Sequence, residues 1–299
     1  MSQMEDFLKE SLELEFVKKQ RAMLCGFISQ GSVFDSNIGK LFVKKNEKVK
    51  GSVMFNGELE SIKAIEKTGI VRVPRPIKVL EDLTQAYIVM EFLEMKSMYS
   101  AQFAEFGTQL AKLHLHNIEL EKTDPSKYVS KFGFHCQTCC GILPQKNEWN
   151  PDWISFYTSK LQEQMDRIKV EQDDEEVEEL WLKCKDKIPN LFAGITIKPS
   201  LIHGDMWSGN VKQLDDGTPV MYDAACFYGH HEYDLGIAGM FGGFSTSFYD
   251  SYHEIIPKEP GFEKRHSLYQ LFHYLNHWNH FGDGYRHGSI SLMEKLYKD

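Results

Sequence analysis

The chain has 299 residues, of which 42% are hydrophobic and 26% are charged, a balance typical of a globular protein with one large or two medium domains. Its net charge of −9 argues against general binding to nucleic acid or to an anionic membrane surface. No apolar run approaches the ~20 residues that a membrane-spanning helix needs. Six cysteines without regular spacing favour a reducing compartment, for which the cytoplasm is the simplest assignment.

The first third of the chain is predicted to be rich in β-structure. Residues 1–24 carry an amphipathic helical pattern without the apolar core of a signal peptide. A second helix is expected at 53–67, and Gly31 is expected to form a turn. Alternating or apolar segments predict strands at 26–30, 33–36, 40–44, 77–80 and 86–90.

The rest of the chain is predicted to be mostly helical. Apolar residues with helical spacing recur at 101–117, 152–170, 174–187, 262–281 and near Leu292. The expected organisation is therefore an α+β protein in three parts. A small β-rich lobe takes 1–90, a connector takes 91–98, and a larger helical lobe takes 99–299.

A polar motif in the predicted helical lobe points to chemistry. It reads H-G-D-M-W-S-G-N at 203–210, and Asp223 follows a short hairpin predicted at 211–222. An aspartate, an asparagine five residues later and a second aspartate beyond a hairpin are typical of kinases. Asp205 is expected to accept the proton of an attacking hydroxyl, while Asn210 and Asp223 bind Mg²⁺ at the phosphates of ATP. The alternative is a structural aspartate that caps a turn.

A lysine and a glutamate in the first lobe could serve the same nucleotide. Lys44 ends an apolar strand, where its ammonium could pair with the α and β phosphates. Glu58 on the following helix is its natural partner. The alternative is a surface strand lysine beside a helical glutamate. Because Lys45 is the next residue, the choice of Lys44 rests on the alternation of side chains along the strand.

Two further segments are candidates for contacts with the nucleotide. Gly31 and Ser32 lie between two predicted strands, where backbone N–H groups could cover the phosphates. One central glycine makes this a weak signal compared with a G-x-G-x-x-G motif. The connector residues Glu91, Phe92 and Leu93 could offer backbone N–H and C=O groups to adenine, an inference from position alone.

Several further blocks of the chain are distinctive besides the motif at 203–210. They are K-F-G-F at 131–134, T-C-C-G at 138–141, N-E-W at 147–149, Y-D-x-A-x-F-Y-G-H at 222–230, M-F-G-G-F at 240–244 and Y-L-N-H-W-N-H-F at 274–281. Through these blocks the chain resembles the fructosamine-3-kinase and ketosamine-3-kinase family nearly end to end. Residues 239–281 look closest to the ketosamine-3-kinase branch.

The resemblance implies a two-lobed, protein-kinase-like fold of the aminoglycoside phosphotransferase type. It implies transfer of the γ-phosphate of ATP to the 3-hydroxyl of a ketosamine (ribulosamine, psicosamine or fructosamine) on a glycated lysine. The phosphorylated adduct decomposes and frees the amine, which is protein deglycation, a repair reaction. Glycated proteins or small ketosamines would be the acceptors. The same roles for Asp205, Asn210, Asp223, Lys44 and Glu58 follow from the motif match.

Two positions depart from the family pattern. Ala224 stands where a proline usually follows the metal aspartate, and Phe27 stands where the family usually has a cysteine, with Cys25 two residues earlier. The redox-sensitive dimerisation of the family is therefore in doubt for this chain, and a monomer or weak homodimer is expected. Neither a D-F-G nor an A-P-E motif is found, which argues against a protein-Ser/Thr kinase.

The acceptor side offers aromatic candidates. Trp207 could form a platform for the sugar, or it could pack the loop onto the lobe below. His277 and Trp278 lie on one apolar helix that either faces the sugar pocket or packs in the core. The cysteines of C-x-x-C-C at 136–140 are interpreted as buried thiols rather than as a zinc finger, because no second pair follows.

Three functions remain compatible with the sequence. The first choice is an ATP- and Mg²⁺-dependent ketosamine-3-kinase. The second is another small-molecule kinase of the same fold, of the aminoglycoside or choline type. The third is a catalytically inactive kinase-like binding module. The presence of suitable residues at all five expected catalytic positions argues against this third function.

Overall fold

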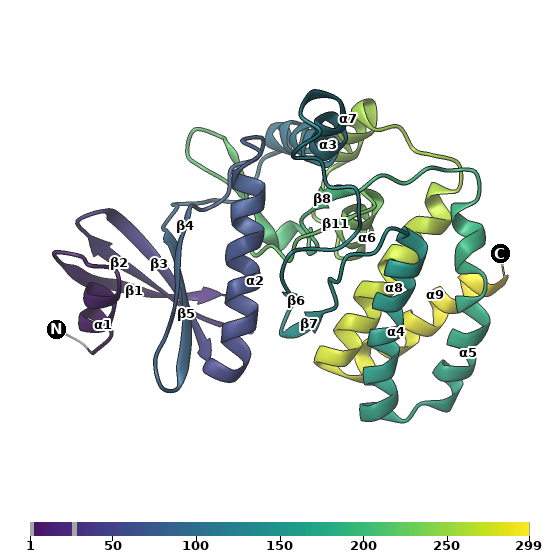
Figure 1. Ribbon diagram of the computed structural model, residues 1–299, viewed down its shortest axis with the longest axis horizontal. Helices are drawn as coiled ribbons and strands as arrows, with labels where there is room; N and C mark the ends of the chain where they lie inside the picture. The colour runs from purple at the N-terminus through teal and green to yellow at the C-terminus, as the bar shows by residue number, and fades with distance from the viewer. Residues whose placement is uncertain (1–2, 26–28, 299) are drawn as a thin grey trace.

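A five-stranded antiparallel sheet in the order β1-β2-β3-β5-β4 forms the N-terminal lobe (Figure 1). The structure is a computed structural model that describes residues 3–25 and 29–298. Leu41 and Val43 point into the core from the middle of the sheet. The elements of this lobe are α1 (Gln3–Ser11), β1 (Val17–Cys25), β2 (Ser29–Ser36), β3 (Gly39–Glu47), α2 (Lys48–Glu66), β4 (Pro76–Glu81) and β5 (Gln85–Glu91).

The second lobe is mainly helical and carries three two-stranded ribbons (Figure 1). Its helices are α3 (Ser100–Thr123), α4 (Trp153–Gln172), α5 (Glu175–Lys185), α6 (Glu232–Met240), α7 (Thr246–Ile255), α8 (Phe262–Phe281) and α9 (Arg286–Lys298). Its strands are β6 (Thr138–Cys140), β7 (Leu143–Gln145), β8 (Ser200–Ile202), β9 (Val211–Gln213), β10 (Pro219–Met221) and β11 (Phe227–Gly229). Short 3₁₀ turns lie at η1 (Ile188–Phe192), η2 (Ser208–Asn210) and η3 (Asp283–Tyr285).

Most of the predicted helices are confirmed, and the hairpin of β9 and β10 is confirmed as well. The prediction of one helix at 1–24 is wrong, because the helix ends at Ser11 and β1 begins at Val17. Pairing with β2 decides this segment, and such tertiary pairing overrides a local helical pattern. The helices α6 and α7 were not predicted, since they are short and contain glycine, serine and aromatic residues that favour helices weakly.

The turn predicted at Gly31 is also wrong. Gly31 and Ser32 lie inside β2, where they pair with Lys44 and Val43 of β3. The strand predicted at 26–30 falls partly outside the described residues. None of the helices in the described part of the chain is both long and apolar enough to cross a bilayer.

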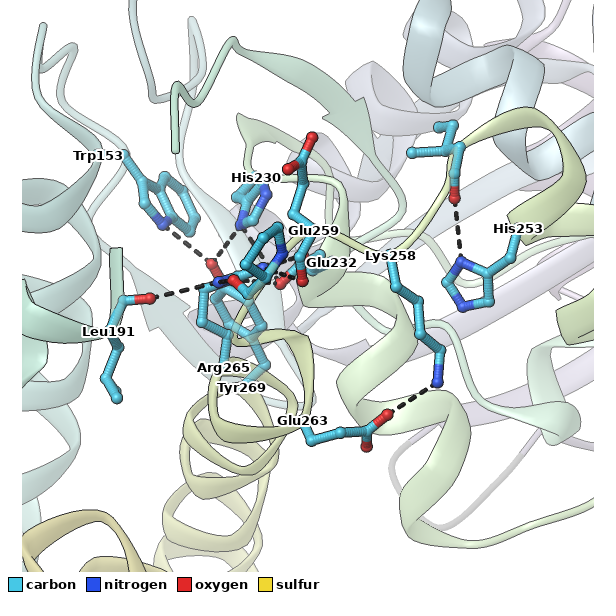
Figure 2. A network of polar contacts seen from close by, with 12 residues as sticks. Trp153, Leu191, His230, Glu232, His253, Lys258, Glu259, Glu263, Arg265 and Tyr269 are labelled. Atoms are coloured by element: carbon cyan, nitrogen blue, oxygen red, sulfur yellow. Dashed lines mark hydrogen bonds and ion pairs between the residues drawn. The ribbon is translucent and has the colours of Figure 1, made fainter. Parts of the chain in front are cut away.

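A buried polar network joins α4, α6 and α8 in the second lobe (Figure 2). The hydroxyl of Tyr269 accepts a hydrogen bond from Trp153 Nε1 at 3.1 Å and lies 2.6 Å from Nδ1 of His230. Nearby, Arg265 donates to both carboxylate oxygens of Glu232 at 2.7 and 2.8 Å. The two members of this bidentate pair are almost fully buried. Because its polar groups satisfy one another, the network holds the start of α6 in one position.

A lysine is buried in the same lobe. Lys160 of α4 is 1% exposed, and its Nζ lies 3.0 Å from Asn147 Oδ1 and 3.1 Å from Gln145 Oε1. The ammonium also lies 4.3 Å from the ring centre of Phe227. Burial lowers the pKa of Lys160 to about 7, despite the nearby charge of Glu163.

This lysine is expected to make stability depend on pH. In the unfolded chain its pKa is ordinary, so between pH 7 and 10 the unfolded state holds the extra proton and the free energy of unfolding rises with pH. The slope is at most about 1.4 kcal/mol per pH unit. Urea unfolding of the wild type and of Lys160→Met at several pH values measures the difference. Parallel stability curves for the two proteins would contradict the lowered pKa.

Candidate active site

One buried carboxylate of α6 holds the loop that carries the polar motif. Asp234 accepts hydrogen bonds from the backbone N–H groups of His203 at 2.7 Å and Gly204 at 2.9 Å. It also contacts His114 Nε2 at 3.1 Å, and the other nitrogen of that ring lies 2.8 Å from the hydroxyl of Tyr252. Burial alone would raise the pKa of Asp234, but the hydrogen bonds and the charges of His114 and His203 together outweigh it, and the pKa is lowered. The carboxylate therefore stays ionised and fixes the loop.

The same loop is locked to the segment after β10. Gly204 has a φ of +84°, and a Cβ there would lie 2.2 Å from the carbonyl oxygen of Ala225, so only glycine fits. The N–H of Ala225 donates to the His203 carbonyl at 2.8 Å. The His203 ring donates from Nε2 to the Tyr222 carbonyl at 3.0 Å and accepts the N–H of Asp205 at 3.2 Å. Burial lowers the pKa of His203, which keeps the ring neutral for this pair of contacts.

Asp205 and Asn210 contact each other directly. The side-chain amide of Asn210 donates to the carbonyl oxygen of Asp205 at 2.9 Å and to its carboxylate at 3.1 Å. Burial, and next the negative charge of Asp223, raise the pKa of Asp205 to about 7. A carboxylate with a pKa near neutral pH is well matched to proton transfer at that pH.

Asp223 lies in a conformation that residues other than glycine rarely adopt. Its φ is +59°, in the left-handed region, and such strain often occurs at functional sites. Its carboxylate, with a side chain 38% exposed, forms an ion pair with Lys44, whose ammonium lies 2.6 Å from Glu58 Oε1. Burial would lower the pKa of Lys44, but the charges of Asp223 and Glu58 outweigh it and raise the pKa. Lys44 is therefore a fixed positive charge between two acids.

The helix that carries Glu58 is tied to the second lobe on both sides of this residue. A Cβ at Gly57 would lie 2.6 Å from the carbonyl oxygen of Gln137, so the two backbones are in close contact. One turn later, the hydroxyl of Ser61 accepts the N–H of Cys226 at 2.9 Å. Figure 1 shows α2 between the sheet and the second lobe. This contact sets where Glu58, and with it Lys44, faces the catalytic loop.

A cavity of about 510 Å³ collects these side chains. It brings together Asp205, Asn210 and Asp223, as the motif spacing predicts. Lys44 and Glu58, which were predicted from a strand end and the helix after it, line the same cavity. Asn210 and Asp223 supply the hard oxygen atoms that Mg²⁺ prefers, so the site fits this metal. The remaining lining residues are Ser29, Met54, Cys139, Cys140, Gly141, Trp207, Ala224, Phe241, Asn276, His277, His280, Phe281 and Tyr285.

Aromatic rings form one wall of the cavity. Trp207, 37% exposed, lies over Gly209, where a Cβ would be 2.1 Å from the indole ring. Its ring contacts Phe241 edge to face at 5.9 Å between centroids. His277 lies 5.1 Å from Phe241 and 5.1 Å from Tyr285. Burial lowers the pKa of His277, and its Nδ1 donates to the carbonyl one turn earlier, which leaves Nε2 as an acceptor.

Six of the predicted site residues lie away from this cavity, and the first three are Trp278, Gly31 and Ser32. Trp278 is 1% exposed and its Nε1 donates to Asp283 at 3.3 Å, so it packs in the core and the expected acceptor contact is wrong. Gly31 and Ser32 are strand residues and do not line the cavity, unlike Ser29 before them. Of the loop expected at 28–32 to cover the phosphates, residues 29–32 belong to β2, and residue 28 lies outside the described residues.

The connector leads from β5 to α3 and does not line the cavity either. The N–H of Glu91 donates to the Arg75 carbonyl at 3.0 Å, and that of Phe92 donates to the Lys40 carbonyl at 2.9 Å. The N–H groups of Glu91 and Phe92 are therefore already hydrogen-bonded within the N-terminal lobe. Among the described residues no acceptor is found for the N–H of Leu93, which is the donor of the three that could still reach a base.

Several residues that organise the site were not found from the sequence. Asp234 lies 31 positions after His203 and 30 after Gly204, and no motif links it to the loop that it holds. Phe241 and Tyr285 lie in or beside glycine-containing segments that resemble ordinary turns. The one signal that could have revealed Asp234 is an acid between the apolar residues Tyr233 and Leu235.

The fold and site define a two-lobed kinase, and comparison with known proteins identifies its family. The family model for fructosamine kinase matches residues 1–299, and the chain therefore belongs to this family. A ketosamine-3-kinase from Mus musculus is 48% identical, over 99% of this chain and 100% of the relative.

Two solved structures show the same fold. A candidate fructosamine-3-kinase from Thermobifida fusca superimposes with a TM-score of 0.82 at 24% identity and covers 99% of both chains. The ADP-bound aminoglycoside phosphotransferase APH(2'')-Ib superimposes with a TM-score of 0.59 at 13% identity, over 98% of this chain and 95% of the other. The predicted kinase-like α+β fold is thus confirmed.

We expect Asp234→Asn to damage both stability and turnover. An amide offers one acceptor atom instead of two, so the N–H of His203 or Gly204 loses its partner. Loss of a hydrogen bond to a charged group costs about 1.5–3 kcal/mol. Urea unfolding measures this loss, and steady-state kinetics should show a fall in kcat. Unchanged stability and kcat would show that the loop is held by other contacts.

Proposed function

We propose that this protein is an ATP- and Mg²⁺-dependent kinase that phosphorylates the 3-hydroxyl of ketosamines. The single observation that carries the proposal is the cavity that Lys44, Glu58, Asp205, Asn210 and Asp223 share, in a chain of the fructosamine kinase family. The 48% identity to a ketosamine-3-kinase supports the choice of acceptor.

In this proposal each polar residue has one role. Lys44, oriented by Glu58, pairs with the phosphates of ATP, and the carbonyl of Glu91 or the N–H of Leu93 contacts adenine. The Asn210 amide oxygen and the Asp223 carboxylate would hold Mg²⁺, which would supply positive charge to the phosphates. Gly31, Ser32 and Phe92 contribute only by shaping the sheet and the connector.

Asp205 is the proposed acceptor of the substrate proton. The Asn210 amide orients its carboxylate, and the backbone N–H of Asp205 is held by the His203 ring. The raised pKa makes the carboxylate a stronger base than an exposed one. The proton of the 3-hydroxyl therefore passes to Asp205 as the hydroxyl oxygen bonds to the γ-phosphorus, and the bond from this phosphorus to the bridging oxygen of ADP breaks.

The aromatic wall is the proposed site of the sugar and of its amine. A ketosamine combines a polar sugar with a secondary amine that is largely cationic near neutral pH. Trp207 offers an exposed indole face, and the neutral His277 offers an acceptor nitrogen. Glycated proteins or small ketosamines are the proposed partners, the cytoplasm is the proposed location, and a monomer or weak homodimer is the proposed state.

Activity is tested first with Asp205→Asn, which keeps the shape of the side chain but removes the base. We expect kcat with a ribulosamine acceptor to fall by about 10²–10⁴, while ATP binding is retained. Coupled ADP release measures kcat, and NMR locates the phosphate on the product. The control is Asp250→Asn, at an exposed position of α7, and EDTA should abolish transfer by the wild type.

Other acceptors separate the alternatives in the same assay. ADP release with choline or an aminoglycoside, but not with a ketosamine, would identify another small-molecule kinase. No stimulation by any acceptor would identify a binding module. Near-normal turnover of Asp205→Asn would rule out the proposed base.

Trp207→Ala tests the sugar platform. Loss of the indole face should raise KM for the ketosamine, because the attraction between the ring and the ammonium, worth ~0.5–2 kcal/mol, is lost. KM for ATP should change little. The matched control is Trp149→Ala, a comparably exposed indole that contacts Tyr228 outside the cavity. Equal loss of affinity for both substrates, or a large fall in Tm, would instead make Trp207 a packing residue.

A further inference from the structure

The proposed base, Asp205, belongs to a cluster of three side chains with different donor atoms. Cys140 of β6, Asp205 of the catalytic loop and His273 of α8 each present one ligand atom, and these sulfur, oxygen and nitrogen atoms lie within 4.8 Å of one another. Cys140 and Asp205 line the cavity, so the cluster can be reached from it. His273 closes the cluster from the protein side and is fully buried.

The histidine of this cluster is not satisfied by the protein. In the described part of the chain, neither ring nitrogen of His273 has a hydrogen-bond partner. The hydroxyl of Tyr233, whose ring lies 5.0 Å from that of His273, is also without a partner there. Buried polar atoms in native proteins are nearly always paired, so each orphan points to a bound water or ion.

The chemistry of the three ligand atoms indicates whether a water or an ion would bind, and which ion. Burial lowers the pKa of His273 to about 3, so the ring is a neutral imidazole, the form that binds metals. Thiolate and imidazole together suit Zn²⁺ and Co²⁺, while Mg²⁺ and Ca²⁺ prefer oxygen ligands alone. Three protein ligands with an open fourth position are typical of zinc sites in which water or another small ligand completes the coordination.

We propose that Cys140, Asp205 and His273 form a second metal site, selective for Zn²⁺ over Mg²⁺, and that its occupation inhibits the enzyme. Binding replaces the proton of the Cys140 thiol by the metal, and that proton passes to the solvent. The metal also takes the carboxylate of Asp205. The inhibition, though not the binding, rests on the proposed role of this carboxylate as the base.

The binding test needs no kinase activity. Metal-free protein is titrated with Zn²⁺ by calorimetry and with Co²⁺ by absorption, where a thiolate ligand produces a charge-transfer band. Excess Mg²⁺ in all samples occupies oxygen ligands such as Asn210 and Asp223 without competing for thiolate. The wild type should bind one equivalent of Zn²⁺, show the Co²⁺–thiolate band and release a proton.

Two variants and two matched controls identify the ligands. His273→Phe and Cys140→Ala should each weaken Zn²⁺ binding more than about tenfold. Cys140→Ala should also remove the band, while His273→Phe should shift its appearance to higher Co²⁺ concentration. Cys184→Ala removes an equally buried thiol on α5, and His266→Phe removes another partly unpaired ring on α8, and both should behave like the wild type. Thermal melts confirm folding, and His273→Gln replaces His273→Phe if the latter does not fold.

The outcomes are separable. A wild type that binds no Zn²⁺, or variants that bind it as the wild type does, would overturn the metal site and assign the cluster to a buried water. Zn²⁺ should inhibit competitively with the ketosamine and not with ATP. Inhibition that persists in Cys140→Ala would overturn the link between the site and inhibition. Zn²⁺ binding by a protein inactive on every ketosamine would uphold the site and reject the proposed function.

Discussion

The carboxylate of Asp234 is the constraint on which the active site depends. It accepts two backbone N–H groups of the catalytic loop from the start of α6. Without an ionised acceptor those buried donors would be left unpaired, at a cost of about 1–3 kcal/mol each. The Arg265–Glu232 pair and the hydrogen bonds of Tyr269 hold α6 itself (Figure 2). The position of the proposed base therefore depends on the packing of α4, α6 and α8.

Charge is concentrated where the two lobes meet. Lys44 from the sheet lies between Glu58 of the same lobe and Asp223 of the other, and its ammonium contacts both acids. A buried lysine is stable as a cation only beside such acids. The ion pairs therefore join the lobes across the cavity, and they place a positive charge where phosphates would need one. Asp223, whose φ is +59°, contributes one of these pairs.

Sequence reasoning succeeded where local pattern and chemistry agreed. The helical spacing at 262–281 predicted α8 to the residue, and the motif spacing predicted that Asp205, Asn210 and Asp223 share one cavity. It failed where distant contacts decide. The segment at 17–25 has a helical composition, yet it becomes β1 because β2 offers backbone partners. Trp278 has an aromatic side chain suited to a sugar, but it faces the core.

The sequence by itself determined the class of chemistry, because the residue types and their spacing in the catalytic motif leave few other uses for them. It also determined the family, since the matching blocks extend nearly from end to end. Only the tertiary structure decided which side of α8 lines the cavity, with His277 there and Trp278 in the core. Only the tertiary structure placed Asp234 beneath the loop and His273 beside Cys140. These pairs are far apart along the chain, and their proximity depends on how helices pack, which no local pattern records.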